Sequence, residues 1–191
     1  MPVTKLDPKT ALVVIDLQKG IVGMPTAHPT ADVVSRASEL AAAFRKHGLP
    51  VVLVNVDAGA PGRTEQSRNF PRADDWADLV PELNQHSNDI TVTKKTWGAF
   101  SSTDLDVRLR KLGVTQVVIA GVATSAGVES TARHAHELGY NVSLATDAMT
   151  DMNADAHTNS ISRIFPRLGE TGTSREIIDL LEAQASHSRS Q

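Results

Sequence analysis

The sequence predicts one α/β domain with three layers, α/β/α, around a doubly wound parallel sheet of about six strands. Short apolar runs alternate with segments whose apolar residues recur at helical spacing, which is typical of parallel α/β proteins. Three predicted helices end at Gly48, Gly113 and Gly139, each followed by a strand, as at the joints of right-handed strand–helix–strand units. With 191 residues, the chain fits one domain at 1–185, followed by a polar tail at 186–191.

The first half of the chain contains three predicted strands. Residues 11–15 are apolar throughout, as in a strand buried on both faces. A helical pattern from Thr30 to Phe44 follows, and then strands at 51–56 and 90–93. Residues 57–88 contain several glycines and prolines and no periodic pattern; a connection of this length is usually functional or a lid.

The second half repeats the alternation of strand and helix. Strands are predicted at 117–120 and 142–145, with a short edge strand at 169–172. Helices are predicted at 103–112, at about 125–138, at 154–167 and from 173 onward. Residues 103–106 and 173–176 resemble capping boxes at two of the helix starts. In such sheets a ligand binds beyond the carboxyl ends of the strands, where the first strand meets its neighbour from the second half.

Composition excludes several classes of protein. With 19 Lys and Arg against 22 Asp and Glu, the net charge is −3, so we expect no nucleic-acid partner. The absence of cysteine excludes disulfides, thiolate metal sites and a cysteine nucleophile. No apolar run approaches the roughly 20 residues of a membrane span, and the N-terminus lacks the pattern of a signal peptide. We therefore expect a cytoplasmic protein without a nucleic-acid or membrane partner.

Three segments at predicted strand ends carry candidate chemistry. Asp16 follows the first strand, although a carboxylate there can also simply cap a nearby backbone. Lys94 and Lys95 follow the third strand, where a solvated surface charge is the ordinary alternative. The turn 121–127 leads into a helix, and its N–H groups can receive an anion or a polarised carbonyl oxygen.

Several familiar motifs are absent. The turn 121–127 lacks the G-x-G-x-x-G order of dinucleotide sites, and no P-loop occurs. The chain has no H-E-x-x-H metal motif and no G-x-S-x-G serine elbow, and its seven histidines do not form a metal-binding pattern. The sequence therefore predicts neither a cofactor nor a metal.

Taken together, the candidate segments resemble the isochorismatase-like hydrolases, a family within the cysteine hydrolases. The resemblance rests on ALVVIDLQ (11–18), KKTWGAF (94–100) and GVATSAGVEST (121–131), which occur in order over most of the domain. It implies the isochorismatase-like fold, a Rossmann-like arrangement. The family's amidases use an Asp-Lys-Cys triad, which the resemblance places at Asp16, Lys94 and position 127.

Position 127 is a glycine in this chain. An amidase of this type needs a thiolate to form its acyl intermediate, whereas true isochorismatases also carry glycine at this position. In their reaction the aspartic acid protonates an enol ether and water completes the hydrolysis. The resemblance therefore implies a metal-independent hydrolase of a small anionic or cyclic substrate, most simply by enol-ether hydrolysis, with Asp16 as the general acid.

The protonation state of Asp16 depends on two opposed effects. Burial at a strand end raises the pKa of a carboxyl group, whereas the Lys94 ammonium lowers it. An acid catalyst needs its proton at working pH. If the effect of Lys94 is the larger, Asp16 stays ionised and acts as a base on water instead.

The resemblance also implies secondary features of the site. The metal-binding Asp-x-His pair of the family's nicotinamidases is absent, because residues 57–59 read Asp-Ala-Gly. Arg68 matches an arginine that binds a substrate carboxylate in isochorismatases, although a solvated loop arginine is equally consistent with the sequence. Trp97 and Phe100 follow the pattern of pocket walls, and for Phe100 we favour packing in the core.

The expected site residues follow from these arguments. Catalytic positions are Asp16, Lys94 and Gly127, and substrate-binding positions are Ala123, Thr124, Trp97 and Arg68. The resemblance further implies a cis peptide bond between Val122 and Ala123, an ion pair between Asp16 and Lys94 within about 4 Å, and a homo-oligomer.

Two alternatives remain open at the level of sequence. One is an amide hydrolase in which Thr124 or Ser125 replaces the cysteine, which we rank lower because the sequence shows no base for either hydroxyl. The other is a catalytically silent homologue that binds a metabolite.

Overall fold

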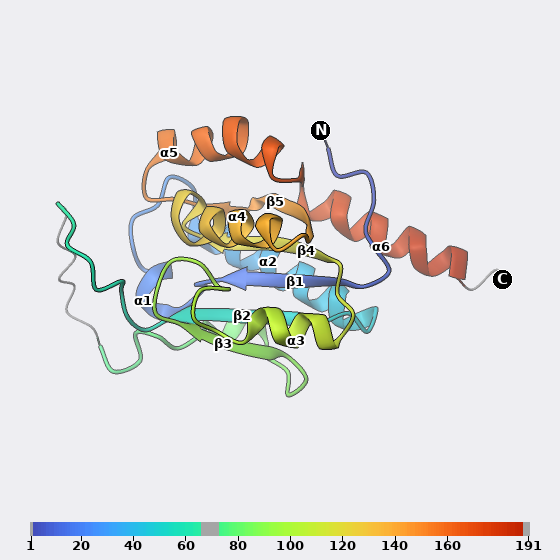
Figure 1. Cartoon of the computed structure of the whole chain (residues 1–191), viewed down its shortest axis with the longest axis horizontal. Helices are drawn as coiled ribbons and strands as arrows, with labels where there is room; N and C mark the ends of the chain where they lie inside the picture. The colour runs from blue at the N-terminus through green and yellow to red at the C-terminus, as the bar shows by residue number, and fades with distance from the viewer. Residues whose placement is uncertain (1, 66–72, 189–191) are drawn as a thin grey trace.

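The computed structural model describes residues 2–65 and 73–188, and Figure 1 shows the arrangement of its elements. The strands are β1 (Thr10–Ile15), β2 (Val51–Val56), β3 (Ile90–Lys94), β4 (Gln116–Val122), β5 (Asn141–Thr150) and β6 (Glu170–Gly172). The helices are α1 (Lys19–Val22), α2 (Thr30–Lys46), α3 (Leu105–Lys111), α4 (Glu129–Glu137), α5 (Ala154–Asn159) and α6 (Ser174–Ser188).

The strands form one parallel sheet in the order β3-β2-β1-β4-β5-β6. Successive strands run outward from β1 to one edge and then from β4 to the other, so the switch between the two halves lies between β1 and β4. The predicted doubly wound, six-stranded parallel sheet is therefore confirmed.

Two apolar layers cover the sheet. Side chains of α2 and α6, such as Phe44 and Leu181, pack on one face. Side chains of α3 and α4, such as Leu109 and Ala132, pack on the other. All six residues of β1 are buried, and their side chains alternate between the two layers, as the apolar run predicts. Figure 1 shows α2 behind the sheet and α3 and α4 in front of it.

The strand β5 contains a change of register that shapes the edge of the sheet. Leu144 pairs with Ile119, but the next pairing joins Met149 to Gly121, so four residues of β5 (145–148) lie opposite a single residue of β4. Leu144 and Met149 both pack in the layer of α3 and α4. An uninterrupted strand would place these two side chains on opposite faces, because they are an odd number of residues apart.

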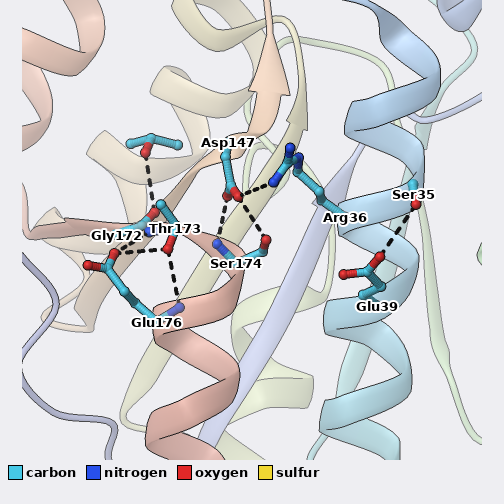
Figure 2. A network of polar contacts seen from close by, with 9 residues as sticks. Ser35, Arg36, Glu39, Asp147, Gly172, Thr173, Ser174 and Glu176 are labelled. Carbon is cyan, nitrogen blue, oxygen red and sulfur yellow. Dashed lines mark hydrogen bonds and ion pairs between the residues drawn. The ribbon is translucent and has the colours of Figure 1, made fainter.

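The start of α6 has the predicted capping box. The Thr173 N–H donates to Glu176 Oε2 at 2.7 Å, and the Glu176 N–H donates to Thr173 Oγ1 at 3.2 Å. Asp147 of β5 accepts bonds from the Ser174 N–H at 2.6 Å and from Arg36 of α2 at 2.8 Å, so one carboxylate connects a strand with two helices. Figure 2 shows this network around Asp147.

Other predicted elements need correction. The start of α3 is not a capping box, because Asp106 Oδ1 accepts bonds from Tyr140 and Arg110 instead. The predicted helix at 154–167 is α5 followed by a π-helical turn at Ser160–Ile164 and a 3₁₀ turn at Phe165–Arg167. Helix α6 extends to Ser188, into the segment 186–191 that the sequence sets apart as a tail. Among the described residues, no helix is both long and apolar enough to cross a membrane.

Candidate active site

A cavity of about 390 Å³ lies where the carboxyl ends of five strands meet. Asp16 follows β1, Lys94 ends β3, and Asp151 follows β5, while Val56 and Val122 end β2 and β4. These five residues all line the cavity. It therefore occupies the position that doubly wound topology predicts, beyond the strand ends around the switch between β1 and β4.

The cavity contains a buried ion pair. Lys94 Nζ lies 2.7 Å from Asp16 Oδ2, within the predicted 4 Å, and also donates to the Thr96 carbonyl at 3.1 Å. Lys94 is 1% exposed and Asp16 is 6% exposed. The other carboxyl oxygen, Asp16 Oδ1, has no hydrogen-bond partner among the described residues. This oxygen is buried and unpaired, an environment that disfavours the ionised form of the carboxyl group.

The alternation of β3 explains why Lys94, and not Lys95, reaches the site. Val92 and Lys94 are buried, whereas Thr91, Thr93 and Lys95 are exposed. Since side chains alternate along a strand, Lys94 shares the inward face with Val92. The residues alone left both lysines open and the resemblance pointed to Lys94, which is the one that lines the cavity.

Burial raises the pKa of the Asp16 carboxyl to about 6. The charge and the hydrogen bond of Lys94 act in the opposite direction, and burial has the larger effect. The acid form of Asp16 is therefore populated near neutral pH, which an ordinary carboxyl group would not allow.

A close approach of two strands positions Asp16. Its backbone has φ 52°, a left-handed conformation that aspartate tolerates better than most residues, and its N–H donates to the Val54 carbonyl at 2.9 Å. Beside it, Gly121 has φ 120°, and a Cβ there would lie 2.0 Å from the Ile15 carbonyl oxygen. Only glycine fits at this contact, so Gly121 allows β4 to pass directly beside the residue that precedes Asp16.

The turn after β4 begins with the expected cis peptide bond between Val122 and Ala123. It continues as a π-helical turn at Thr124–Val128, and Ala123 and Gly127 line the cavity. A Cβ at Gly127 would lie 2.9 Å from Ile15 Cγ2 and 3.3 Å from Asp16 Oδ2. Position 127 therefore faces Asp16 directly, and the missing side chain leaves the approach to its carboxyl group open.

Two expectations for this turn need correction. Thr124 is fully buried and does not line the cavity, because its hydroxyl is hydrogen-bonded to His157 Nδ1 at 2.8 Å. The N–H groups of the turn 121–127 were expected to be able to receive an anion, but one of them, the Ser125 N–H, donates to Asp151 Oδ2 at 2.7 Å. The side chain of Thr124 therefore stabilises the turn and does not contact a ligand in this cavity.

Both hydroxyl groups have a hydrogen-bond partner that the sequence did not reveal. Ser125 Oγ donates to Asp151 Oδ2 at 2.8 Å, and Thr124 Oγ1 lies beside His157. Neither arrangement activates its hydroxyl group as a nucleophile. Thr124 faces away from the cavity, and the Ser125 hydroxyl bonds to a carboxylate, a base far too weak to deprotonate it without further activation.

Aromatic and methionine side chains form the rest of the wall. Trp97 lines the cavity as expected and is 59% exposed, so it stands at the rim. Trp76 also lines the cavity, and its ring packs directly on Gly20, where a Cβ would lie 2.0 Å from Trp76 Cδ1. Met24 and Met152 complete this apolar part. Phe100 is buried in the core and stacks on Tyr140, as we favoured.

Gln18 holds the segment that carries Trp76. Its fully buried side chain accepts a bond from the Val56 N–H at 2.8 Å and donates to the Trp76 carbonyl at 3.1 Å. The Gly20 N–H donates to the same carbonyl at 3.0 Å. Gln18 and Gly20 therefore hold Trp76, a wall residue more than 50 positions along the chain, in place. The sequence did not indicate this role.

The remaining expectations concern loop residues and metals. Arg68 lies outside the described residues. In the part of the chain that the structure describes, no group of three or more His, Asp and Glu side chains is arranged to hold a metal ion.

Comparisons with known proteins agree with this architecture. The family model for the isochorismatase domain matches residues 10–176. YwoC, an isochorismatase family protein of Bacillus subtilis, is 44% identical over 90% of this chain and 93% of its own length. Nicotinamidase 3 of Arabidopsis thaliana is 30% identical over 84% of each chain. The solved structure of an isochorismatase family protein from Burkholderia thailandensis superposes with a TM-score of 0.90 at 41% identity, covering 93% of this chain and 98% of that one.

Proposed function

Because this chain belongs to the isochorismatase family of hydrolases, we propose that it hydrolyses an enol ether of a small anionic or cyclic molecule, with Asp16 as the general acid. The observation that carries the proposal is the buried Asp16 carboxyl group, whose pKa is raised to about 6 and whose Oδ1 has no partner among the described residues. The chain has no cysteine, so the thiolate route of the family's amidases is closed to it.

The reaction needs one proton and one water molecule. Protonated Asp16 donates its proton to the terminal carbon of the enol-ether double bond, which leaves an oxocarbenium ion. Water adds to that ion and returns a proton to Asp16, and the resulting hemiacetal or hemiketal collapses to a carbonyl compound and an alcohol. Lys94 stays hydrogen-bonded to Asp16 Oδ2 throughout, so it orients the carboxyl group and stabilises its ionised form.

A panel of two enol ethers tests the proposal. Isochorismate releases pyruvate on hydrolysis, and cyclohexyl vinyl ether, an uncharged analogue, releases acetaldehyde. Turnover of either substrate, with one deuterium incorporated at the methyl carbon of the product in D₂O, is the expected result. Turnover of neither substrate, or hydrolysis without deuterium incorporation, would contradict the assignment of Asp16 as a proton donor.

The dependence of kcat/KM on pH distinguishes a general acid from a general base at Asp16. If Asp16 donates the proton, its active form is the protonated one, so kcat/KM should stay level below the pKa of about 6 and fall as pH rises through it. A general base would give the opposite slope over the same interval. A profile measured from pH 4.5 to pH 9 distinguishes the two.

Replacing Lys94 with methionine should raise the pH at which kcat/KM falls. Lys94 contributes both the charge and the hydrogen bond that lower the pKa of Asp16, so without it the pKa rises above 6 and the acid form persists to higher pH. The matched control is Lys95→Met, which removes the same charge from the exposed neighbour. An unchanged pH profile in Lys94→Met would show that the fall in kcat/KM is not due to the titration of Asp16.

Adding a side chain at position 127 should lower turnover. In Gly127→Cys or Gly127→Ala, the new Cβ enters the space between Ile15 Cγ2 and Asp16 Oδ2, so the carboxyl group or the substrate must move. We expect a fall in kcat/KM of about 10-fold or more, since small misplacements of reacting groups are costly. The control is Gly23→Ala, where the nearest atom would lie at an ordinary 3.6 Å. Unchanged kinetics in both variants at 127 would show that this position does not face the substrate.

A further inference from the structure

Asp151 is a second buried carboxylate of the cavity, and the mechanism above does not use it. The residue follows β5, is 4% exposed and lines the cavity. Its Oδ2 accepts bonds from the Ser125 N–H and the Ser125 hydroxyl, and its Oδ1 accepts one from the Asn153 N–H at 3.0 Å. These three bonds fix the orientation of the carboxylate.

The position of Asp151 is the one that an anionic ligand would otherwise take. The π-helical turn at Thr124–Val128 continues directly into α4, so Ser125 lies in the first turn of a helical segment of 14 residues, 124–137. The N–H groups at such a helix start attract anions. Here the Ser125 N–H already donates to a carboxylate of the protein itself, so a substrate carboxylate would have to compete with it.

The other charges of the cavity do not compensate for Asp151. Among the described residues that line it, the charged side chains are Asp16, Lys94 and Asp151. At pH 7.5, above the pKa of about 6, the Asp16 carboxyl group is mostly ionised and pairs with Lys94 at 2.7 Å, so the negative charge of Asp151 is unbalanced. The lining also includes the rings of Trp76 and Trp97 and the side chains of Met24 and Met152, which suit the apolar body of a ring.

We propose that Asp151 determines specificity: it excludes carboxylates from this cavity, which therefore accepts an uncharged cyclic molecule. The inference rests on the proposed function in that it concerns the substrate of the same site, and it selects the cyclic, uncharged member from the range of substrates considered there.

A matched pair of ligands tests the inference without turnover. Cyclohexanecarboxamide and cyclohexanecarboxylate have nearly the same shape and differ in charge, and titration calorimetry or NMR gives a Kd for each at pH 7.5. We expect the wild-type protein to bind the amide at least about 10-fold more tightly than the carboxylate, because a like charge in a desolvated cavity is strongly repelled.

Two substitutions of Asp151 separate its charge from its hydrogen bonds. Asp151→Asn removes the charge and keeps an acceptor for the Ser125 N–H, so the preference for the amide should shrink. Asp151→Ala also frees that N–H, so the carboxylate should bind at least as well as the amide. The control is Asp155→Asn, the same change at an exposed residue four positions along the chain, which should leave the ratio as in wild type.

Three results would overturn the inference: equal or tighter binding of the carboxylate by the wild type, a ratio that neither substitution of Asp151 changes, or no binding of either ligand. Its failure can be distinguished from that of the proposed function. Efficient turnover of isochorismate, a dicarboxylate, with poor turnover of cyclohexyl vinyl ether would support enol-ether hydrolysis and contradict the role of Asp151. The reverse preference would support both.

Discussion

Replacing Asp16 with asparagine should lower kcat by at least about 100-fold, the usual contribution of a positioned general acid. The amide has nearly the same shape and still offers an oxygen to Lys94 Nζ, which lies 2.7 Å from Asp16 Oδ2. It cannot donate a proton to carbon, however, because an amide is not an acid in this pH range. Steady-state kinetics on the better substrate of the pair, normalised to the folded fraction from circular dichroism, measures the effect.

The control for this variant is again Asp155→Asn, which changes the charge of an exposed side chain outside the cavity and should keep wild-type kcat. If Asp16→Asn retains more than about a tenth of the activity, the proton comes from another group. The falling limb of the pH profile should also vanish in Asp16→Asn, since the titrating group has been removed.

Gly121→Ala should strongly destabilise the sheet. The added Cβ would lie 2.0 Å from the Ile15 carbonyl oxygen and 2.6 Å from the Ile15 nitrogen, both of them backbone atoms of the neighbouring strand. Backbone atoms cannot rotate away, so the strands must separate where Ile15 pairs with Gly121. The φ of 120° adds strain for any residue with a side chain. We expect a loss of more than about 4 kcal/mol in the free energy of unfolding, a large fraction of the roughly 5–15 kcal/mol of a typical domain.

Gly139→Ala isolates the part of this effect that is due to conformation alone. Gly139 also has a positive φ, 86°, but a Cβ there meets nothing within 4 Å. Urea denaturation should show a loss of about 1–2 kcal/mol, the cost of a left-handed conformation. If the two variants lose the same stability, the contact with Ile15 is not responsible, and the argument for how β4 approaches β1 is wrong.

The sheet could be predicted from the sequence because its strands are short, apolar and separated by helices with periodic stripes. The structure confirms this pattern for β1, whose residues are all buried. Helix α1 could not be predicted in this way, because none of its four residues is buried and so no apolar stripe marks it. The polar residues near the end of β5, Asp147 and Thr150, likewise conceal that the strand runs on to Thr150.

The residues of the candidate site likewise differ in whether a local sequence pattern predicts them. Asp16 and Lys94 could be identified because each stands at the end of a strand, and parallel topology brings strand ends together. Trp76 and Asp151 could not, since one lies in a connection without periodicity and the other beyond the register change of β5. The orientation of Thr124 depends on His157, 33 residues away, which no local pattern reveals.

The register change in β5 has a consequence for comparing the sequences of relatives. The four residues 145–148 lie opposite one residue of β4, and this surplus returns Met149 to the same core layer as Leu144. Deleting one of them would turn the following residues to the opposite face of the sheet, because side chains alternate at every step. A relative with a shorter segment there can keep an aspartate in its alignment column and still present a different side chain to the cavity. The number of residues between Leu144 and Asp151 therefore has to be matched before the residue type at 151 is compared.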